Sequence, residues 1–245
     1  MNSYQLRQLM AAQPEAKLRD LVAKLLYDEI LSLRLRPGTR LNVNQIASAL
    51  GISRTPVADA VAYLSEIGFV CTRPGQSGSF VLELSLSDMI SLYRVRSAVE
   101  CEAAALAAHN ASDSTVRELN NLAEAFRDNV TRRDIRGMKE TDMPFHRLVV
   151  ESSGNPYILR CYELLLPKLT MYQSSMVEFI ALTQSGDNPW MSSVQYNHVS
   201  VVSAIRMRMP ELARKAMADH VDSSLSFTSF AGNGADPFLA LRGEE

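Results

Sequence analysis

The sequence is poor in cysteine, and it lacks the features of exported and membrane-spanning proteins. Its three cysteines, Cys71, Cys101 and Cys161, lie far apart and form no CxxC pair. An odd number of widely spaced cysteines predicts reduced thiols in a cytoplasmic protein. No apolar run reaches the roughly 18 residues that a membrane span needs. Residues 1–17 lack the apolar core and cleavage site of a secretory signal, so we expect no membrane association.

Aromatic residues are also scarce, at 7% of 245 residues, whereas alanine, leucine and methionine are frequent. This composition favours helices, and the length suits one large domain or two ordinary ones. The net charge of −2 is unevenly spread. Residues 1–75 carry nine Lys/Arg and six Asp/Glu, and residues 76–245 carry sixteen and twenty-one. Residues 1–75 are thus mildly basic and residues 76–245 are acidic, which is compatible with phosphate binding by residues 1–75.

The first 83 residues show the order of a winged helix-turn-helix. Apolar spacing predicts a helix over residues 18–33, and a second, short helix over 43–50 ends at Gly51. Ser53 is placed to cap the next helix, which tolerates Pro56 in its first turn. Two candidate strands follow, over residues 69–73 and 78–84, joined by a turn at 74–77. We therefore predict a winged-helix domain over residues 1–83.

The rest of the chain reads almost entirely as helix. Residues 84–87 form a predicted linker, in which Ser87 can cap the helix that follows. The predicted helices span residues 88–109, 113–133, 135–153, 156–184, 190–207 and 210–229. The sequence therefore predicts a mainly α protein with an antiparallel helical bundle over residues 88–230, and a loose tail over 231–245.

Histidine is rare, yet three of the four histidines are placed where one metal ion can use them. Asp142 and His146 are four residues apart, so they share one face of a helix. Pro144 lies between them and predicts a bend or an early start of that helix. His198 and His220 follow in two later helices. One carboxylate and three imidazoles suit Zn²⁺, Ni²⁺, Mn²⁺ or Fe²⁺, and this set of ligands does not choose among them.

Two groups of residues resemble the two halves of a known family. Residues 35–41 (LRPGTRL), Ile46-Ala47 and residues 50–57 (LGISRTPV) resemble the DNA-binding head of GntR-family bacterial regulators. The second half resembles the FCD ligand-binding domain of the FadR subfamily. Its matching residues are Arg96, Glu100, Asp142, Phe145, His146, Ser153, Gly154, Asn155, His198 and His220. The resemblance covers about residues 18–230. It implies a ligand-responsive DNA-binding regulator, usually a repressor, that acts as a homodimer.

The expected DNA contacts lie at the start of the predicted recognition helix. Ser53 and Ala58 flank Arg54 and Thr55, of which Arg54 can bind guanine O6 and N7, and Thr55 a phosphate or a thymine methyl group. Many relatives have arginine at position 58, so this chain lacks that contact. Many also carry arginine before the wing glycine, where this chain has Ser77-Gly78. The nearby Arg73 and Gln76 are candidates to compensate.

The expected effector is a small carboxylate metabolite. Arg96 is the best candidate to bind its carboxylate through two parallel hydrogen bonds. The alternative is an exposed ion pair with Glu100, which contributes little. Asn155 either faces the pocket or caps a helix. Three further residues are candidates to tune effector choice: Tyr172, Gln173 and Gln195.

Several functions remain open for the metal residues. The leading hypothesis is a regulator that binds a palindromic double-stranded operator as a homodimer and responds to an organic acid. A metal-dependent hydrolase is the competing class, but no convincing general base is present and a winged helix has no role in hydrolysis. A metal-ion sensor and a purely structural metal are further alternatives.

Overall fold

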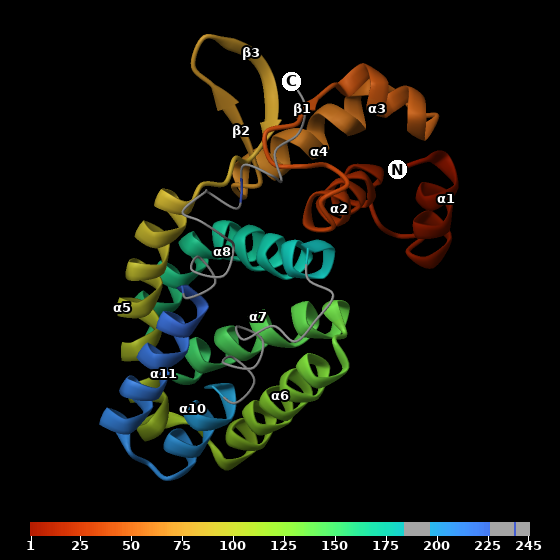
Figure 1. The fold of residues 1–245 in the computed structure, drawn as a ribbon. Helices are drawn as coiled ribbons and strands as arrows, with labels where there is room; N and C mark the ends of the chain where they lie inside the picture. Colours follow the sequence, from red (N-terminus) through yellow and green to blue (C-terminus); the bar gives the residue numbers. More distant parts are fainter. Residues whose placement is uncertain (184–196, 226–237, 239–245) are drawn as a thin grey trace. The chain divides into compact units, whose positions relative to one another are not determined.

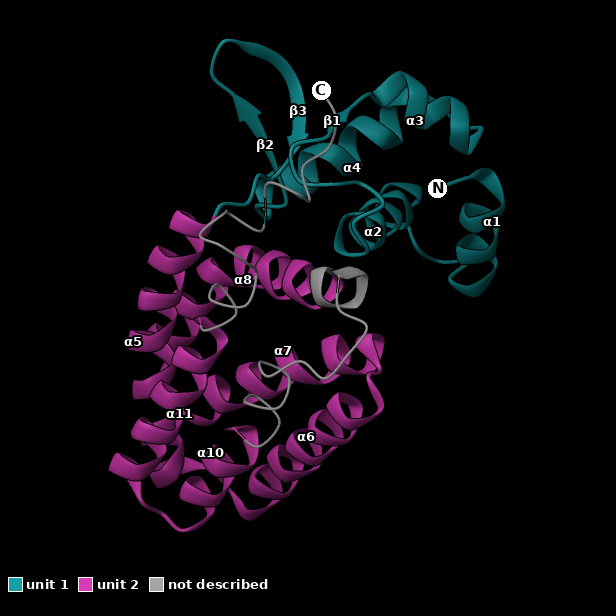
Figure 2. Ribbon diagram, viewed as in Figure 1, with its two compact units in different colours: residues 1–85, 238–245 teal, residues 86–237 magenta. Residues whose placement is uncertain are grey.

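The computed structural model describes residues 1–183, 197–225 and 238. Within them the chain forms two compact units (Figures 1 and 2), the first from residues 1–85 and the second beginning at Leu86. Both units consist largely of helices, and the first also holds a small sheet. The predicted fold class, a mainly α protein with an N-terminal winged helix and a helical second half, is confirmed. No helix in the described part of the chain is long and apolar enough to cross a membrane.

The first unit is a winged helix-turn-helix with one extra helix at its start. Its helices are α1 (Ser3–Ala12), α2 (Leu18–Leu31), α3 (Val43–Leu50) and α4 (Arg54–Glu66). Its strands are β1 (Arg40–Leu41), β2 (Val70–Arg73) and β3 (Gln76–Val81). Helix α4 packs against α2 and α3, and its apolar face, including Val57 and Leu64, is buried. Helix α1 and strand β1 were not predicted, because short elements give little periodic signal.

The turn between α3 and α4 sets the position of α4, the helix that was predicted to contact DNA. Gly51 ends α3 in the left-handed region, with φ of 69°, where glycine meets no steric penalty. Ser53 occupies the N-cap position of α4, but its side chain makes no capping hydrogen bond. The predicted side-chain cap is therefore wrong, and the first turn of α4 is left with amide groups that an anion can bind.

The wing is a three-stranded antiparallel sheet in the order β1-β3-β2. Pro74 and Gly75 alone join β2 to β3, and Gly75 has φ of 75°. This tight turn starts β3 at Gln76, so the expected strand over 78–84 was placed too late at both ends. Arg40 pairs with Phe80 across the sheet, which brings β1 beside the wing.

The second unit contains six helices in the described residues. They are α5 (Leu86–Asn110), α6 (Asp113–Arg132), α7 (Ile135–Ser152), α8 (Pro156–Thr183), α10 (Asn197–Arg206) and α11 (Pro210–Leu225). Helix α5 begins inside the expected linker 84–87, so Ser87 lies in its first turn and does not cap it. The remaining parts of the expected helices 190–207 and 210–229 lie largely outside the described residues. So does the expected tail 231–245, except for Phe238, which is buried.

Helices α5, α7, α10 and α11 pack around a common interior (Figure 1). Helix α5 lies along α11, and it also contacts α7, α8 and α10. Helix α7 is further held between α6 and α8 and continues through Pro144 without a break in its assignment. This packing brings residues from α7, α10 and α11 to one place, although they are distant in sequence.

Candidate functional site

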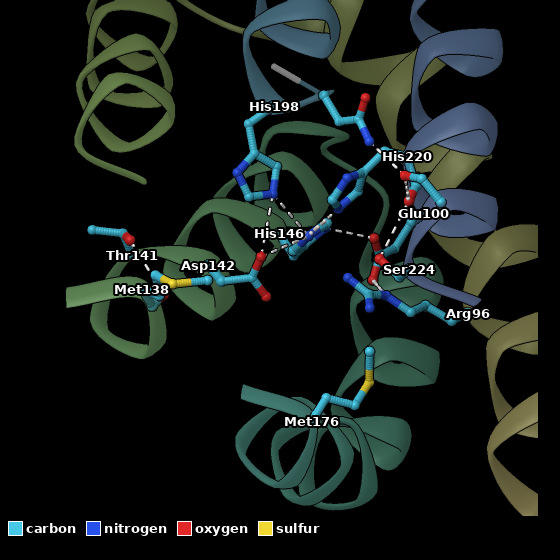
Figure 3. Close-up of polar contacts among 12 residues, drawn as sticks. Arg96, Glu100, Met138, Thr141, Asp142, His146, Met176, His198, His220 and Ser224 are labelled. Carbon is cyan, nitrogen blue, oxygen red and sulfur yellow. Dashed lines mark hydrogen bonds and ion pairs between the residues drawn. The ribbon is translucent and has the colours of Figure 1, made fainter. Parts of the chain in front are cut away.

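Four buried side chains converge in the interior of the second unit. Helix α7 supplies Asp142 and His146, α10 supplies His198, and α11 supplies His220. One potential ligand atom from each lies within 4.8 Å of the others. The Nε2 atom of His146 is 3.3 Å from that of His198 and 2.9 Å from that of His220. The Oδ1 atom of Asp142 is 3.3 Å from His198 Nε2 and 3.8 Å from His146 Nε2 (Figure 3).

Three of these distances, 2.9 Å and twice 3.3 Å, are close to those between ligands of a single transition-metal ion, and the 3.8 Å between Asp142 and His146 is wider. Two donors that each lie about 2.1 Å from one ion are about 3.0 to 3.4 Å apart at octahedral or tetrahedral angles. Three neutral imidazole rings that face one another cannot satisfy all three nitrogens by hydrogen bonding among themselves, so the arrangement is suited to holding a cation. The set of one carboxylate oxygen and three nitrogens therefore suits a divalent ion with borderline ligand preference.

The protonation states also favour metal binding. Burial lowers the pKa of His220 well below its ordinary value, and the neighbouring His198 and His146 lower it further. Burial likewise lowers the pKa of His198. Burial opposes ionisation of Asp142, but His198 and His146 hold its pKa at about 2. At neutral pH His198 and His220 are thus neutral imidazoles and Asp142 is a carboxylate, the forms that bind metal ions.

Glu100 is a candidate functional residue whose contact with His146 was not predicted from the sequence. Its Oε2 atom lies 2.7 Å from Nδ1 of His146 and has no other hydrogen-bond partner among the described residues. Its Oε1 atom accepts a hydrogen bond of 2.8 Å from Nε of Arg96. Burial opposes the ionisation of Glu100, but Arg96 and His146 lower its pKa to about 2. Figure 3 shows this carboxylate between the arginine and the histidine.

The contact with Glu100 therefore favours one orientation of the His146 ring, in which Nε2 faces the other candidate ligands. A carboxylate beside Nδ1 favours the ring form with hydrogen on Nδ1, which leaves a lone pair on Nε2. The side chains of Arg96 and Glu100 are 2% and 0% exposed. The exposed surface pair considered from the sequence is therefore wrong, because both residues lie on the buried face of α5.

A small cavity adjoins Asp142 and His220, two of the four potential ligands. It is lined by Tyr93, Arg96, Phe126, Met138, Asp142, Gln173, Met176, Val177, His220 and Ser224. The centres of water-sized molecules can occupy about 20 Å³ of it, which is room for one or two waters. Arg96 Nη2 is buried and has no hydrogen-bond partner among the described residues. This donor at the cavity wall can bind an anion.

The other expected effector residues are arranged differently. The side chain of Asn155 accepts hydrogen bonds from the backbone N–H groups of Tyr157 and Ile158, so it caps α8 and is absent from the described cavity lining. The Tyr172 hydroxyl donates to Asp88 at 2.9 Å and is also absent from that lining. Of the three tuning candidates, Gln173 lines the cavity. Gln195 lies outside the described residues.

The recognition helix of the first unit presents its first turn to solvent. Ser53, Arg54, Thr55 and Ala58 are all exposed, while Val57 between them is buried. The unbonded first-turn amides of α4 add a partial positive charge. These residues form a surface that can contact phosphates and base edges.

Two arginines, Arg73 and Arg40, make hydrogen bonds within the wing and differ in their exposure. Arg73 forms an ion pair with Glu83 at 2.5 Å, donates to the Gly38 carbonyl at 3.0 Å, and lies 4.4 Å from the centre of the Phe80 ring. Its guanidinium is thus used within the unit. Exposed Arg40 donates to the Ser77 carbonyl at 3.0 Å. The sequence reading did not single out Arg40, which lies beside the wing through the β1–β3 pairing.

Two other wing residues can be placed. Gln76 is exposed at the start of β3 and lies 3.5 Å from Arg73. Gly78 has φ of 118°, and a Cβ atom there would lie 3.0 Å from Nε of Arg40. The backbone conformation therefore favours glycine at this position, and any side chain there would have to displace Arg40.

Comparison with known proteins matches both units to described domains. Residues 18–81 match the bacterial regulatory proteins of the gntR family, and residues 91–223 match the FCD domain. A probable D-xylose utilization operon transcriptional repressor of Paenarthrobacter nicotinovorans is 30% identical over 208 residues, which cover 85% of this chain and 87% of the relative. The HTH-type transcriptional repressor RspR of Escherichia coli is 26% identical over the same shares of each chain.

Solved structures share the fold. Escherichia coli McbR/YncC has a TM-score of 0.70 at 20% identity, and the match covers 89% of this chain and 100% of that one. A GntR regulator from Rhodococcus sp. RHA1, described as a possible transcriptional regulator, has a TM-score of 0.65 at 22% identity, with 88% and 99% covered. With a gntR-type winged helix followed by an FCD domain, the chain belongs to the GntR family of bacterial DNA-binding transcriptional regulators, in its FadR-like subfamily.

Proposed function

We propose that the protein is a cytoplasmic, metabolite-controlled repressor that binds a palindromic operator as a homodimer. In this proposal a divalent metal ion is held by Asp142, His146, His198 and His220. A small organic acid binds beside the metal at Arg96 and weakens operator binding. Two relatives are named transcriptional repressors, which supports repression rather than activation of the controlled genes.

One observation carries the proposal: four potential metal ligands converge at a cavity whose wall holds an arginine with an unpartnered donor. Asp142 and His220 belong to both the ligand set and the cavity lining, so a metal there would be accessible to a small molecule in the cavity. Arg96 Nη2 supplies a buried donor on the same cavity. A purely structural metal site would not require this adjoining donor.

The metal, Arg96 and Glu100 would each have a different role in binding the effector. When bound, the metal would act as a Lewis acid that accepts an effector oxygen. Arg96 would donate hydrogen bonds to the carboxylate, while its Nε stays paired with Glu100 at 2.8 Å. Glu100 would hold His146 in the ring form that presents Nε2 to the ligand set. The apolar side chains around Arg96 would exclude water and strengthen its pairing with an anion.

DNA binding would use the exposed start of α4 and the wing. Arg54 would contact a base edge or phosphate in the major groove, and Thr55 a phosphate or a thymine methyl group. Ser53, Gln76 and Gly78 would approach the backbone, and Arg40 would add a phosphate contact next to the wing. Ala58 and Arg73 would contribute through shape and wing geometry, because Ala58 has no polar side chain and the guanidinium of Arg73 is used internally.

The effector would act by favouring one arrangement of the dimer. Two heads must match the spacing of two operator half-sites, which lie about 34 to 36 Å apart or multiples of that distance. A ligand shifts this equilibrium only by the difference in its affinity for the two arrangements. We therefore expect effector affinity and operator affinity to change reciprocally.

The first experiment measures bound metal by elemental mass spectrometry in protein without a histidine tag. The wild-type chain, the double variant His146→Ala/His198→Ala and the exposed-site control His109→Ala are compared. We expect about one divalent ion per chain in the wild type and the control, and loss of the ion in the double variant. Metal-reconstituted wild-type protein without bound metal would refute the metal-centred site, while operator binding by α4 would remain to be tested separately.

A further inference from the structure

The exposed face of α4 carries short side chains at the place where we propose that DNA binds. Residues three, four and seven positions apart lie on one face of a helix. On α4 this spacing groups Thr55, Ala58, Asp59 and Ala62, and all four are exposed. Val57, which points the other way, is buried in the core of the unit. Three of the four grouped residues thus present a methyl group to solvent.

The charged residues of α4 lie at the two edges of this face. Arg54 begins the helix at one edge. At the other edge, Asp59 lies near Arg19 of α2, because the pKa of Arg19 is raised by its hydrogen bond to Asp20 and, to a smaller extent, by Asp59. The guanidinium carbon of Arg19 also lies 5.8 Å from the centre of the Tyr63 ring, one turn after Asp59. Arg54 and Asp59 thus leave the middle of the face to small side chains.

Small side chains let a helix approach the base edges closely. An α-helix with its side chains is about 10 to 12 Å across, and the major groove is about 12 Å wide. A helix face with Ala58 and Ala62 at its middle is thinner than one with long side chains, so its backbone can enter the groove more deeply. The methyl group of alanine neither donates nor accepts a hydrogen bond. It therefore distinguishes bases only by apolar contact, and the apolar group that a base pair presents in the major groove is the C5 methyl group of thymine.

We infer that Ala58 contacts the C5 methyl group of a thymine in each operator half-site, with the methyl group of Thr55 beside it. Ala62, one turn further along the same face, lets the helix come close enough for this contact. The inference rests on the proposed binding of operator DNA by α4, and it adds which base the middle of the helix selects. The charged Arg54 fixes the helix on the DNA, and Ala58 selects for thymine.

The first step of the test selects operators from a duplex library with about 30 randomised base pairs, which can hold two half-sites one or two helical turns apart. The full-length wild-type chain should select thymine at one fixed position in each half-site. Arginine binds O6 and N7 of guanine, so Ala58→Arg should change that position to guanine. Ser65→Arg is the matched control. It adds the same charge at an exposed position two turns later on α4, and it should still select thymine.

The second step changes only the methyl group on the DNA. Thymine at the selected position is replaced in one half-site by uracil, and affinity is measured by fluorescence anisotropy. Uracil should bind roughly three- to fourfold more weakly, which corresponds to about 0.8 kcal/mol for one buried methyl group. At the same position 5-methylcytosine should bind more tightly than cytosine by a similar factor. In Ala58→Gly, checked for folding by circular dichroism, the difference between thymine and uracil should shrink to less than about twofold.

The outcomes separate this inference from the proposed function. If the wild-type chain selects a defined operator but binds uracil as tightly as thymine, the methyl contact is overturned and operator recognition remains. If Ala58→Arg selects the same base as the wild type, residue 58 does not face the bases and the inference is also overturned. If the wild-type chain selects no sequence over a scrambled duplex, the proposed operator binding fails and the inference fails with it.

Discussion

Replacing Glu100 with glutamine should weaken both the fold of the second unit and the proposed metal site. The carboxylate has two acceptor oxygens, one facing Arg96 Nε at 2.8 Å and the other facing His146 Nδ1 at 2.7 Å. Glutamine offers only one acceptor oxygen and a donor amide. Whichever way the amide turns, either Arg96 or His146 loses its acceptor in a fully buried position.

The expected magnitude follows from the burial of this group. Breaking a buried ion pair by removing one charge costs about 3 to 5 kcal/mol. For a unit of this size the thermal midpoint falls by about 2 to 4 °C per kcal/mol, so a loss of about 10 °C is expected. Loss of a group that orients a metal-bound histidine typically lowers metal affinity by about 10- to 100-fold. Arg96 would also be less well oriented toward a carboxylate.

The assay is competition with a chelator of known affinity, together with calorimetric unfolding of the metal-free and metal-bound chain. Glu102→Gln is the matched control, because Glu102 lies on the same helix but forms a partly exposed pair with Arg214; such a pair contributes at most about 1 kcal/mol. Glu100→Asp, which restores the charge on a shorter side chain, should recover part of the metal affinity. Metal affinity within about twofold of wild type in Glu100→Gln would refute the reasoning.

Three further predictions concern DNA binding and pH. Arg54→Ala should cost about 1 to 3 kcal/mol for the specific operator, measured by fluorescence anisotropy against a scrambled duplex; an equal loss on both duplexes would contradict a base contact. Arg40→Ala should weaken binding to all sequences and reduce the salt slope by about one unit, and an unchanged slope would remove it from the phosphate contacts. The metal-free chain should lose stability below about pH 6.5, because His198 and His220 bind protons in the unfolded chain but resist them when buried. The loss is at most about 1.4 kcal/mol per histidine per pH unit, and chemical unfolding that is flat from pH 7 to pH 5 would contradict it.

Stability should fall again in stronger acid. The pKa values of Glu100 and Asp142 are lowered to about 2 in the folded chain. Their contribution is therefore complete above the ordinary carboxyl pKa of about 4 and is lost as the pH falls from there toward 2. The two pH ranges separate the histidines from the carboxylates.

Residues near one another in the sequence carried most of the information about the first unit. Gly51 after a short apolar helix, and Pro74-Gly75 between two candidate strands, predict turns through backbone conformations that depend on those residues alone. The apolar spacing of α2 and α4 likewise predicts their buried faces. The start of β3 and the cap of α4 were misplaced, because strand ends and caps depend on hydrogen bonds that alternative local geometries can satisfy.

The candidate metal ligands could be proposed from the sequence because Asp142 and His146 share a helix face and histidine is otherwise rare. Their convergence with His198 and His220 was decided by the packing of α7, α10 and α11, which no spacing specifies. Tertiary structure also decided the role of Glu100. The spacing of Arg96 and Glu100 is the same for an exposed pair and a buried one, and only the burial of that face of α5 against α7 and α11 makes the carboxylate a bridge to His146. The residue types are encoded locally, but the environment that gives them their chemistry comes from helices that are distant in sequence.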